Sequence, residues 1–171
     1  MFEALAIIPA RGGSKSIPGK NIKPLNGFPL LAYSIAAAKQ SKSVTRVVVN
    51  TDCERIAEIA RAHGAETPFL RPSELAQDDT LDLPVFQHQL RWHAEREGYK
   101  PDAVIHLRPT SPFRPVDLTD RTVQMLAEHP EADSARAVVP SGENPYKMWR
   151  LNEQGRLRPL MEGEFSEPYN M

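Results

Sequence analysis

The first chemistry that the residues suggest is phosphate binding, in a short segment rich in glycine and cations. Residues 9–21 read PARGGSKSIPGKN and place Arg11, Lys15 and Lys20 beside three glycines. Glycine lets backbone N–H groups approach an anion closely, and Arg and Lys supply the positive charge that attracts a polyphosphate. A P-loop would need Ser or Thr where Asn21 stands, so this segment is not a Walker A motif. We interpret it as a phosphate-binding loop; the alternative is a solvated basic turn.

Short apolar runs alternate with helix-like stretches over most of the sequence, which indicates how this loop is positioned. Four runs have the composition of buried strands: ALAII, RVVVN, AVIHL and ARAVV, at residues 4–8, 46–50, 103–107 and 135–139. Four stretches have apolar residues at helical spacing. One begins after Pro29, one is capped by Asp52, one covers residues 83–97 and ends before Gly98, and one is capped by Asp117. This alternation predicts a three-layer α/β fold with a mostly parallel sheet.

Three loops are predicted to share one edge of that sheet. In parallel α/β sheets ligands bind beyond the carboxyl ends of the strands. The segments that follow Ile8, Asn50 and Leu107 all begin at such ends. The basic loop is therefore expected at the ligand-binding edge. In the fourth helix we expect Leu118, Met125 and Leu126 to face inward.

Four motifs in order carry a family resemblance. They are IPARGGSKSIPGKNIKPLNGFPLLAYSI at 8–35, VVVNTD at 47–52, FLRPSELAQDDT at 69–80 and LRPTSPFRP at 107–115. Together they resemble the acylneuraminate cytidylyltransferases, also called CMP-sialic acid synthetases. The resemblance implies a Rossmann-like nucleotidyltransferase fold and a cytoplasmic enzyme of nucleotide sugar biosynthesis. It would couple CTP to a nine-carbon 3-deoxy-2-keto acid sugar, giving a CMP-sugar and pyrophosphate.

The resemblance also implies a set of site residues. Arg11 and Lys20 are the expected catalytic residues, because they match the family's triphosphate-binding cations. The expected nucleotide-binding residues are Ala10, Arg11, Gly12, Gly13, Ser14, Lys20, Asn21, Arg71, Asp79 and Thr80. Within that set Arg71 helps to hold the cytosine, and Asp79 and Thr80 close over the base and ribose, with a register shift of one residue left open. The expected sugar-binding residues are Arg108, Pro109, Thr110 and Ser111, together with Lys147.

The sequence departs from the family at two points. Sialic acid enzymes commonly carry glutamine where Arg108 stands, and arginine only donates hydrogen bonds whereas glutamine also accepts. The acceptor sugar or the base can therefore differ, and alternatives are a GTP-dependent enzyme acting on a related sugar or a catalytically silent nucleotide-binding module. The family also implies Mg²⁺, held by paired aspartates in a segment beyond Met171. We therefore expect no metal ligand within this chain.

Composition limits the remaining possibilities. The 171 residues carry 21 Lys and Arg against 22 Asp and Glu, so the net charge of −1 gives no case for nucleic-acid or membrane binding. No apolar run is long enough to span a membrane, and the single cysteine rules out an internal disulfide. We expect a nucleotidyltransferase domain at 1–139. At 140–171 we expect a small projecting arm, a hairpin in which Gly155 separates two mixed runs, that forms a homodimer.

Overall fold

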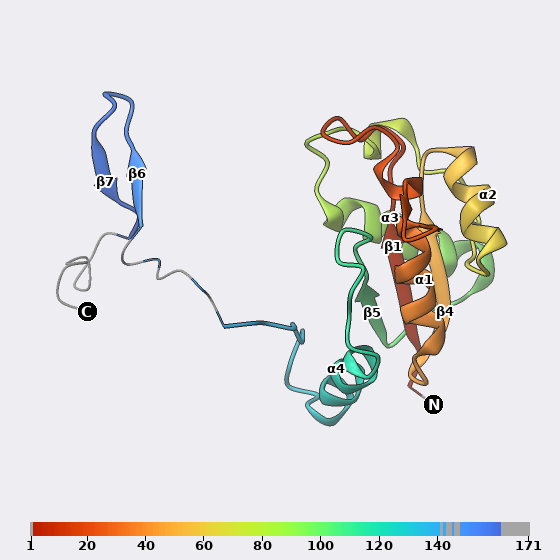
Figure 1. Cartoon of the computed structure of the whole chain (residues 1–171). Helices are drawn as coiled ribbons and strands as arrows, with labels where there is room; N and C mark the ends of the chain where they lie inside the picture. Colours follow the sequence, from red (N-terminus) through yellow and green to blue (C-terminus); the bar gives the residue numbers. More distant parts are fainter. Residues whose placement is uncertain (1, 141, 143–144, 146–147, 162–171) are drawn as a thin grey trace. The chain divides into compact units, whose positions relative to one another are not determined.

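The computed structural model describes residues 2–140, 142, 145 and 148–161 (Figure 1). The chain divides into two compact units, Met1–Arg136 and Ala137–Met171. The predicted division at residues 139 and 140 falls close to this boundary.

The first unit is built on a parallel sheet of three strands. These are β1 (Ala4–Pro9), β4 (Val44–Asn50) and β5 (Ala103–His106), in the order β4-β1-β5. Ile7 of the central strand pairs with Val48 on one side and His106 on the other. The apolar runs predict these strands correctly, since a central strand covered on both faces reads as a continuous apolar segment.

Four helices and several short elements connect the strands. The helices are α1 (Leu30–Gln40), α2 (Glu54–Ala62), α3 (Asp82–Glu97) and α4 (Leu118–Glu128). Two short 3₁₀ turns, η1 (Lys20–Ile22) and η2 (Ser73–Leu75), lie in the loops after β1 and after α2. A two-residue pair, β2 (Pro24–Leu25) and β3 (Phe28–Pro29), leads into α1. Among the described residues no helix is long and apolar enough to cross a membrane.

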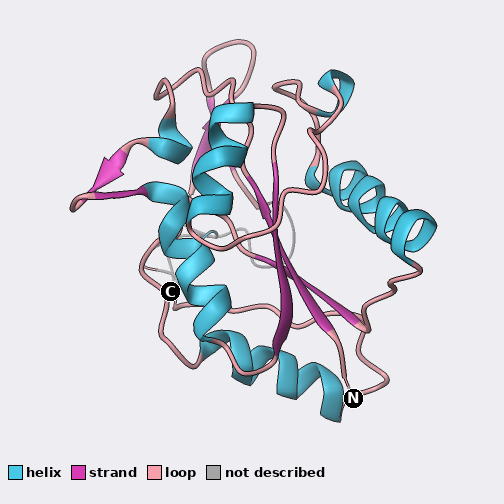
Figure 2. Ribbon diagram, turned by 90° about the vertical axis from the view of Figure 1, so that its right-hand side faces the viewer, coloured by secondary structure: helices cyan, strands magenta, loops and turns pink. Residues whose placement is uncertain are grey.

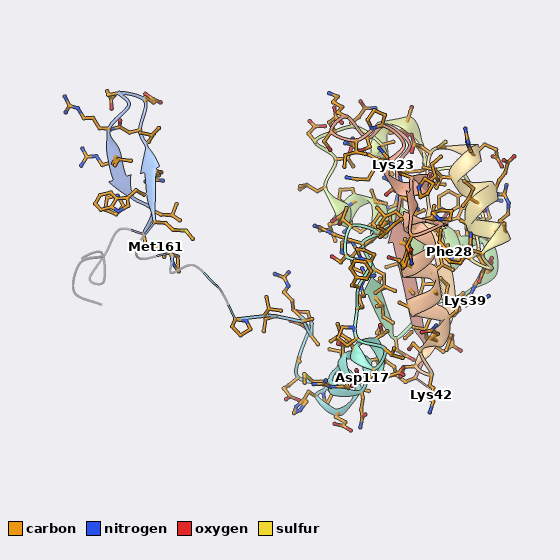
Figure 3. The ribbon with its side chains drawn as sticks, viewed as in Figure 1. Lys23, Phe28, Lys39, Lys42, Asp117 and Met161 are labelled. Carbon is orange, nitrogen blue, oxygen red and sulfur yellow. The ribbon has the colours of Figure 1, made fainter. Side chains whose placement is uncertain are left out.

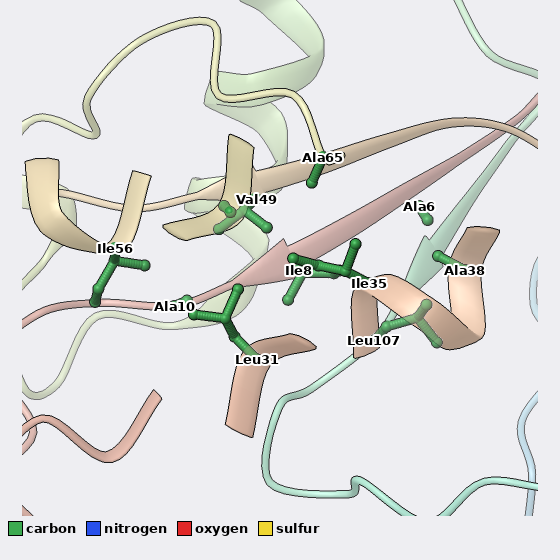
Figure 4. Close-up of a cluster of buried hydrophobic side chains, with 11 residues drawn as sticks. Ala6, Ile8, Ala10, Leu31, Ile35, Ala38, Val49, Ile56, Ala65 and Leu107 are labelled. Carbon is green, nitrogen blue, oxygen red and sulfur yellow. The ribbon is translucent and has the colours of Figure 1, made fainter. Parts of the chain in front are cut away.

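Side chains alternate between the two faces of the sheet and give two core clusters. On one face Ile8 and Val49 pack with Leu31 and Ile35 of α1 and with Ile56 of α2 (Figure 4). On the other face a second cluster packs against α3; it consists of Leu5, Ile7 and Val48 with Phe86, Leu90 and Tyr99. Helices therefore lie on both sides of the strands, as Figure 2 shows. This is the predicted three-layer arrangement.

The second unit contains an antiparallel hairpin. Strands β6 (Trp149–Leu151) and β7 (Leu157–Pro159) pair in register, with Arg150 opposite Arg158. Gly155 in the turn has φ of 72°, a left-handed conformation that glycine adopts without steric cost. The hairpin predicted around Gly155 is therefore confirmed.

Three local predictions are corrected by the structure. Residues 135–139 form no strand, because no described strand lies beside them to supply backbone hydrogen bonds, and Val138 and Val139 are exposed. Met125 of α4 is exposed, and Thr119 and Val123 form the buried side of that helix. Asp52 precedes α2 but makes no capping hydrogen bond, since the first residue before that helix is Cys53.

Candidate functional site

A pocket of about 210 Å³ opens at the carboxyl ends of the parallel strands. The loops after β1 and β5 contribute two of its walls, as predicted. The third wall comes from the segment after α2 and not from the predicted turn directly after Asn50, which contributes no lining residue. Figure 3 shows Lys23, which follows η1, at this end of the first unit and Lys42, which precedes β4, at the opposite end. The lining residues are Pro9, Arg11, Ser14, Lys20, Asn21, Arg71, Gln77, Asp78, Thr80, Asp82, Val85, Arg108, Pro109 and Thr110.

The loop after β1 is fixed by backbone contacts that its sequence permits. Gly12 donates its N–H to Asp52 Oδ1 at 2.8 Å, and a Cβ at Gly12 would lie 2.9 Å from Cys53 Cβ. Glycine is therefore required by the close approach of two loops. The buried Asn21 donates from Nδ2 to the carbonyl of Arg11 at 2.9 Å, which holds the cationic end of the loop.

Two cations of this loop share one carboxylate. Arg11 Nη1 lies 2.7 Å from Asp78 Oδ1, and Lys15 Nζ pairs with Asp78 Oδ2. The Lys15 and Arg11 hydrogen bonds hold the pKa of Asp78 below its ordinary value. Lys20 also lines the pocket and has no ion-pair partner among the residues that the structure describes. An anionic ligand would therefore meet the unpaired Lys20 beside Arg11 and Lys15, whose two positive charges share one carboxylate.

Arg71 lies buried at the back of the pocket. Its Nε donates to Asn50 Oδ1 at 2.5 Å, and its Nη2 donates to the Asn50 carbonyl at 2.6 Å. Its Nη1 reaches the Leu75 carbonyl at 3.4 Å. Burial lowers the pKa of the Arg71 guanidinium from its ordinary value, although arginine still keeps its charge at neutral pH. Three of its five N–H groups donate hydrogen bonds to described residues, and the other two can donate to a ligand.

The loop after β5 forms the opposite rim. Arg108 pairs with Asp82 at the start of α3, and its Nε donates to His106 Nε2 at 3.3 Å. Burial lowers the pKa of His106, so its imidazole is neutral at pH 7 and accepts at Nε2. The Arg108 carbonyl is held by Ser34 Oγ at 3.2 Å and by Arg114. The rim is therefore anchored to α1.

The structure brings together most of the predicted site residues. Nine line the pocket: Arg11, Ser14, Lys20, Asn21, Arg71, Thr80, Arg108, Pro109 and Thr110. Five do not: the side chain of Ala10 belongs to the core, and Gly12, Gly13, Asp79 and Ser111 lie outside the lining. Lys147 lies outside the described residues. Whether any of these residues binds a nucleotide or a sugar stays a prediction.

Sequence reasoning missed five of the lining residues, which are Pro9, Gln77, Asp78, Asp82 and Val85. Four of them come from the segment between η2 and the first turns of α3. The motif QDDT offered two adjacent aspartates, both exposed, and among the described residues Asp78 pairs with the cations of the loop after β1 whereas Asp79 makes no ion pair. Which of the two aspartates takes part in closing over the base and ribose stays a prediction.

The described residues do not fit a metal ion. They contain no group of three or more His, Cys, Asp and Glu side chains that could hold one. The two carboxylates of the pocket, Asp78 and Asp82, are each taken up by cations.

Comparison with known proteins identifies the family. A family model described as "Cytidylyltransferase" matches residues 5–152. This chain belongs to the cytidylyltransferase family. The family resemblance carried by the four sequence motifs is thereby confirmed.

Individual cytidylyltransferases give the same result. The chain is 38% identical over 153 residues to a CMP-N,N'-diacetyllegionaminic acid synthase from Legionella pneumophila, covering 90% of this chain and 65% of that protein. It is 44% identical over 110 residues to an N-acylneuraminate cytidylyltransferase from Escherichia coli, covering 64% of this chain and 25% of that protein. The chain thus spans less than two thirds of the length of either relative.

A solved structure supports the fold. A CMP:2-keto-3-deoxy-manno-octonic acid synthetase complexed with CTP superposes with a TM-score of 0.64 at 23% identity. The match covers 75% of this chain and 48% of that one. The predicted nucleotidyltransferase fold is confirmed.

Proposed function

We propose that this protein transfers the cytidylyl group of CTP to a sialic acid-like 3-deoxy-2-keto acid sugar, giving a CMP-sugar and pyrophosphate. The observation that carries the proposal is the convergence of Arg11, Lys20, Arg71 and Arg108 on one pocket at the ligand-binding edge of a cytidylyltransferase. The names of the relatives, a legionaminic acid synthase and an acylneuraminate cytidylyltransferase, support the sugar class.

The reaction is a displacement at phosphorus. The anomeric hydroxyl oxygen of the sugar forms a bond to the α-phosphorus, the bond from that phosphorus to the bridging oxygen breaks, and pyrophosphate leaves with the electron pair. The hydroxyl proton passes to solvent. Arg11 and Lys20 would neutralise charge that grows on the phosphate oxygens, which is where such reactions gain most of their rate.

The two remaining cations suit the two ends of the substrate pair. Arg71 is a donor-only side chain, so it fits the carbonyl and ring nitrogen acceptors of a cytosine edge. Arg108 on the rim offers a donor-only group to the sugar carboxylate. Guanine also presents acceptors, which keeps GTP as the rival nucleotide.

Measurement of pyrophosphate release tests the proposal directly. The chain is incubated with Mg²⁺, each of the four nucleoside triphosphates and a panel of 2-keto acid sugars. We expect release with CTP and a nine-carbon sugar only. Pyrophosphate release with GTP would show that GTP and not CTP is the nucleotide substrate. CTP binding without pyrophosphate release with any sugar would show that the chain is a catalytically silent nucleotide-binding module.

We further propose that the second unit mediates a homodimer. Its exposed apolar side chains support this: Val138, Val139, Leu151, Leu157, Leu160 and Met161. Monomeric proteins rarely expose so much apolar surface in a short segment. A two-fold dimer would cover the same patch on both copies.

The proposed use of CTP fits a cytoplasmic location, where nucleoside triphosphates are held.

A further inference from the structure

A continuous line of polar side chains runs from the pocket through the interior of the first unit and ends at the exposed Glu97. We name it the polar relay and define it as Arg71, Asn50, Gln89, His93 and Glu97. Arg71 Nε donates to Asn50 Oδ1 at 2.5 Å, and Asn50 Nδ2 donates to Gln89 Oε1 at 2.7 Å. Gln89 Nε2 lies 3.0 Å from His93 Nε2, and His93 Nδ1 lies 3.2 Å from Glu97 Oε2. The three central side chains are at most 1% exposed.

The relay fits the spacing of the elements that carry it. Gln89, His93 and Glu97 follow one another at intervals of four residues and form one stripe along α3. That stripe is about 12 Å long, and β4 from Arg46 to Asn50 spans about 13 Å. Asn50 meets the first residue of the stripe, and Arg46 Nη1 meets Glu97 Oε2 at 2.5 Å. The stripe on α3 is thus held at both ends by β4.

The chemistry of the two ends dictates the orientation of everything between them. Arg71 can only donate and the Glu97 carboxylate can only accept. Asn50 must therefore turn its oxygen toward Arg71, and Gln89 must turn its oxygen toward Asn50. The amide of Gln89 then donates to His93 Nε2, so His93 is neutral and carries its proton on Nδ1.

The groups around His93 favour the same tautomer. The Glu97 carboxylate faces Nδ1, and Arg46 donates to that carboxylate and keeps it ionised by lowering its pKa. The ring of Tyr99 lies 5.7 Å from the imidazole. A second proton, on Nε2, would face the donating amide of Gln89. To avoid that clash both amides would have to reverse, and Asn50 would then present a donor to Arg71.

We propose that Gln89 and His93 are positioning residues for Arg71, which they hold in the orientation that contacts the base of the nucleotide. This inference rests on the proposed function for the identity of the ligand. Buried hydrogen-bonded networks of this kind fix one geometry, because a single unpaired member in a low-dielectric interior is costly. Neither residue touches the pocket, and their effect passes through Asn50.

Nuclear magnetic resonance of the unmodified chain tests the relay without any nucleotide. In ¹⁵N-labelled protein at pH 7 we expect His93 to be neutral and protonated on Nδ1. Its imidazole signals are assigned by their loss in His93→Gln. We also expect the Arg71 Nε–H to be protected from exchange with solvent. This protection should be lost in Gln89→Leu and kept in His93→Gln, because the introduced glutamine amide can both accept and donate. An Nε2-protonated or doubly protonated His93, or unchanged protection in Gln89→Leu, would overturn the relay.

Calorimetric titration then separates positioning from general damage. Gln89→Leu and His93→Phe should bind CTP about tenfold more weakly, the effect of about one hydrogen bond, and should bind inorganic tripolyphosphate as the wild type does. His93→Gln should stay close to wild type for both ligands. The matched control is His129→Gln, which breaks an exposed pair of His129 with Glu131 and should change nothing.

The outcomes distinguish this inference from the proposed function. Equal losses for CTP and tripolyphosphate, or unchanged CTP binding in both relay variants, would overturn the positioning role. A wild-type chain that binds CTP no better than tripolyphosphate would overturn the proposed nucleotide specificity. The relay itself would then still be judged by the resonance measurements.

Discussion

Lys20 and Arg11 are the residues whose loss should weaken nucleotide binding most directly. Both line the pocket from a surface loop, so Lys20→Ala and Arg11→Ala should fold normally. A charge-assisted contact contributes about 1.5–3 kcal/mol, which corresponds to roughly a 10- to 100-fold loss of CTP affinity. Calorimetric titration measures this loss, with Lys23→Ala as a control from the same segment outside the pocket lining. Unchanged affinity in both variants would remove the loop from the site.

Asp78 has the opposite role, because its carboxylate pairs with two cations of the loop after β1, of which Arg11 lines the pocket. A phosphate ligand must compete with it for Arg11 and Lys15. Asp78→Asn should therefore tighten tripolyphosphate binding several-fold, whereas Asp79→Asn should leave it unchanged, since only Asp78 makes these ion pairs. Titrations of the two variants against wild type make the comparison. Weaker binding in Asp78→Asn would show that the carboxylate organises the cations instead of competing with the ligand.

At the scale of elements, α4 is joined to the connection between α1 and β4 by Asp120. Its Oδ1 accepts from Ser41 Oγ at 2.5 Å and from the Ser43 N–H at 2.9 Å. The Ser41 hydrogen bond is the main cause that lowers the pKa of Asp120 from 3.8 to about 2. A carboxyl group whose pKa is lower in the folded protein than in the unfolded chain stabilises the fold at any pH above the unfolded pKa. That contribution is lost as the pH falls toward the pKa of the folded protein.

Asp120→Asn should therefore destabilise the first unit by about 1–2 kcal/mol at pH 7. The difference from wild type should shrink as the pH is lowered from 7 toward 3, because the Asp120 carboxyl of the unfolded chain, with its ordinary pKa of 3.8, takes up a proton before the folded one does. Urea unfolding at several pH values measures it. Asp117→Asn, at an exposed position in a 3.5 Å pair with Arg121, is the matched control. A gap that stays constant with pH would contradict the charged role of Asp120.

At the scale of the whole molecule, the proposed homodimer predicts a change of mass on truncation. The intact chain should be a dimer at micromolar concentration, and a chain cut before Pro140 should be a monomer, because it lacks the hairpin. Light scattering on both chains measures the masses. The double variant Leu151→Ser with Leu157→Ser keeps the full length and should also weaken the dimer, since both side chains are exposed on the hairpin. A monomeric intact chain would exclude the dimer.

The sequence by itself determined the parallel strands, the helix that ends before Gly98, the hairpin around Gly155 and the edge of the sheet where the pocket opens. These features depend on local periodicity and on which residues tolerate a turn, and both are visible in a stretch of ten to fifteen residues. The motif order also fixed the family. The strand expected at 135–139 failed, because a strand exists only with a neighbour to pair with.

Only the tertiary structure decided which side chains meet. Asp78 and Asp79 are equivalent in the sequence, and the loop conformation turns one of them toward the cations. Asn50 and Gln89 are separated by 39 positions, and no local pattern indicates that they share a buried hydrogen bond. Their contact arises because α3 packs over β4, and among the described residues burial leaves the side chains of Asn50, Gln89 and His93 no hydrogen-bond partner except their neighbours in the relay.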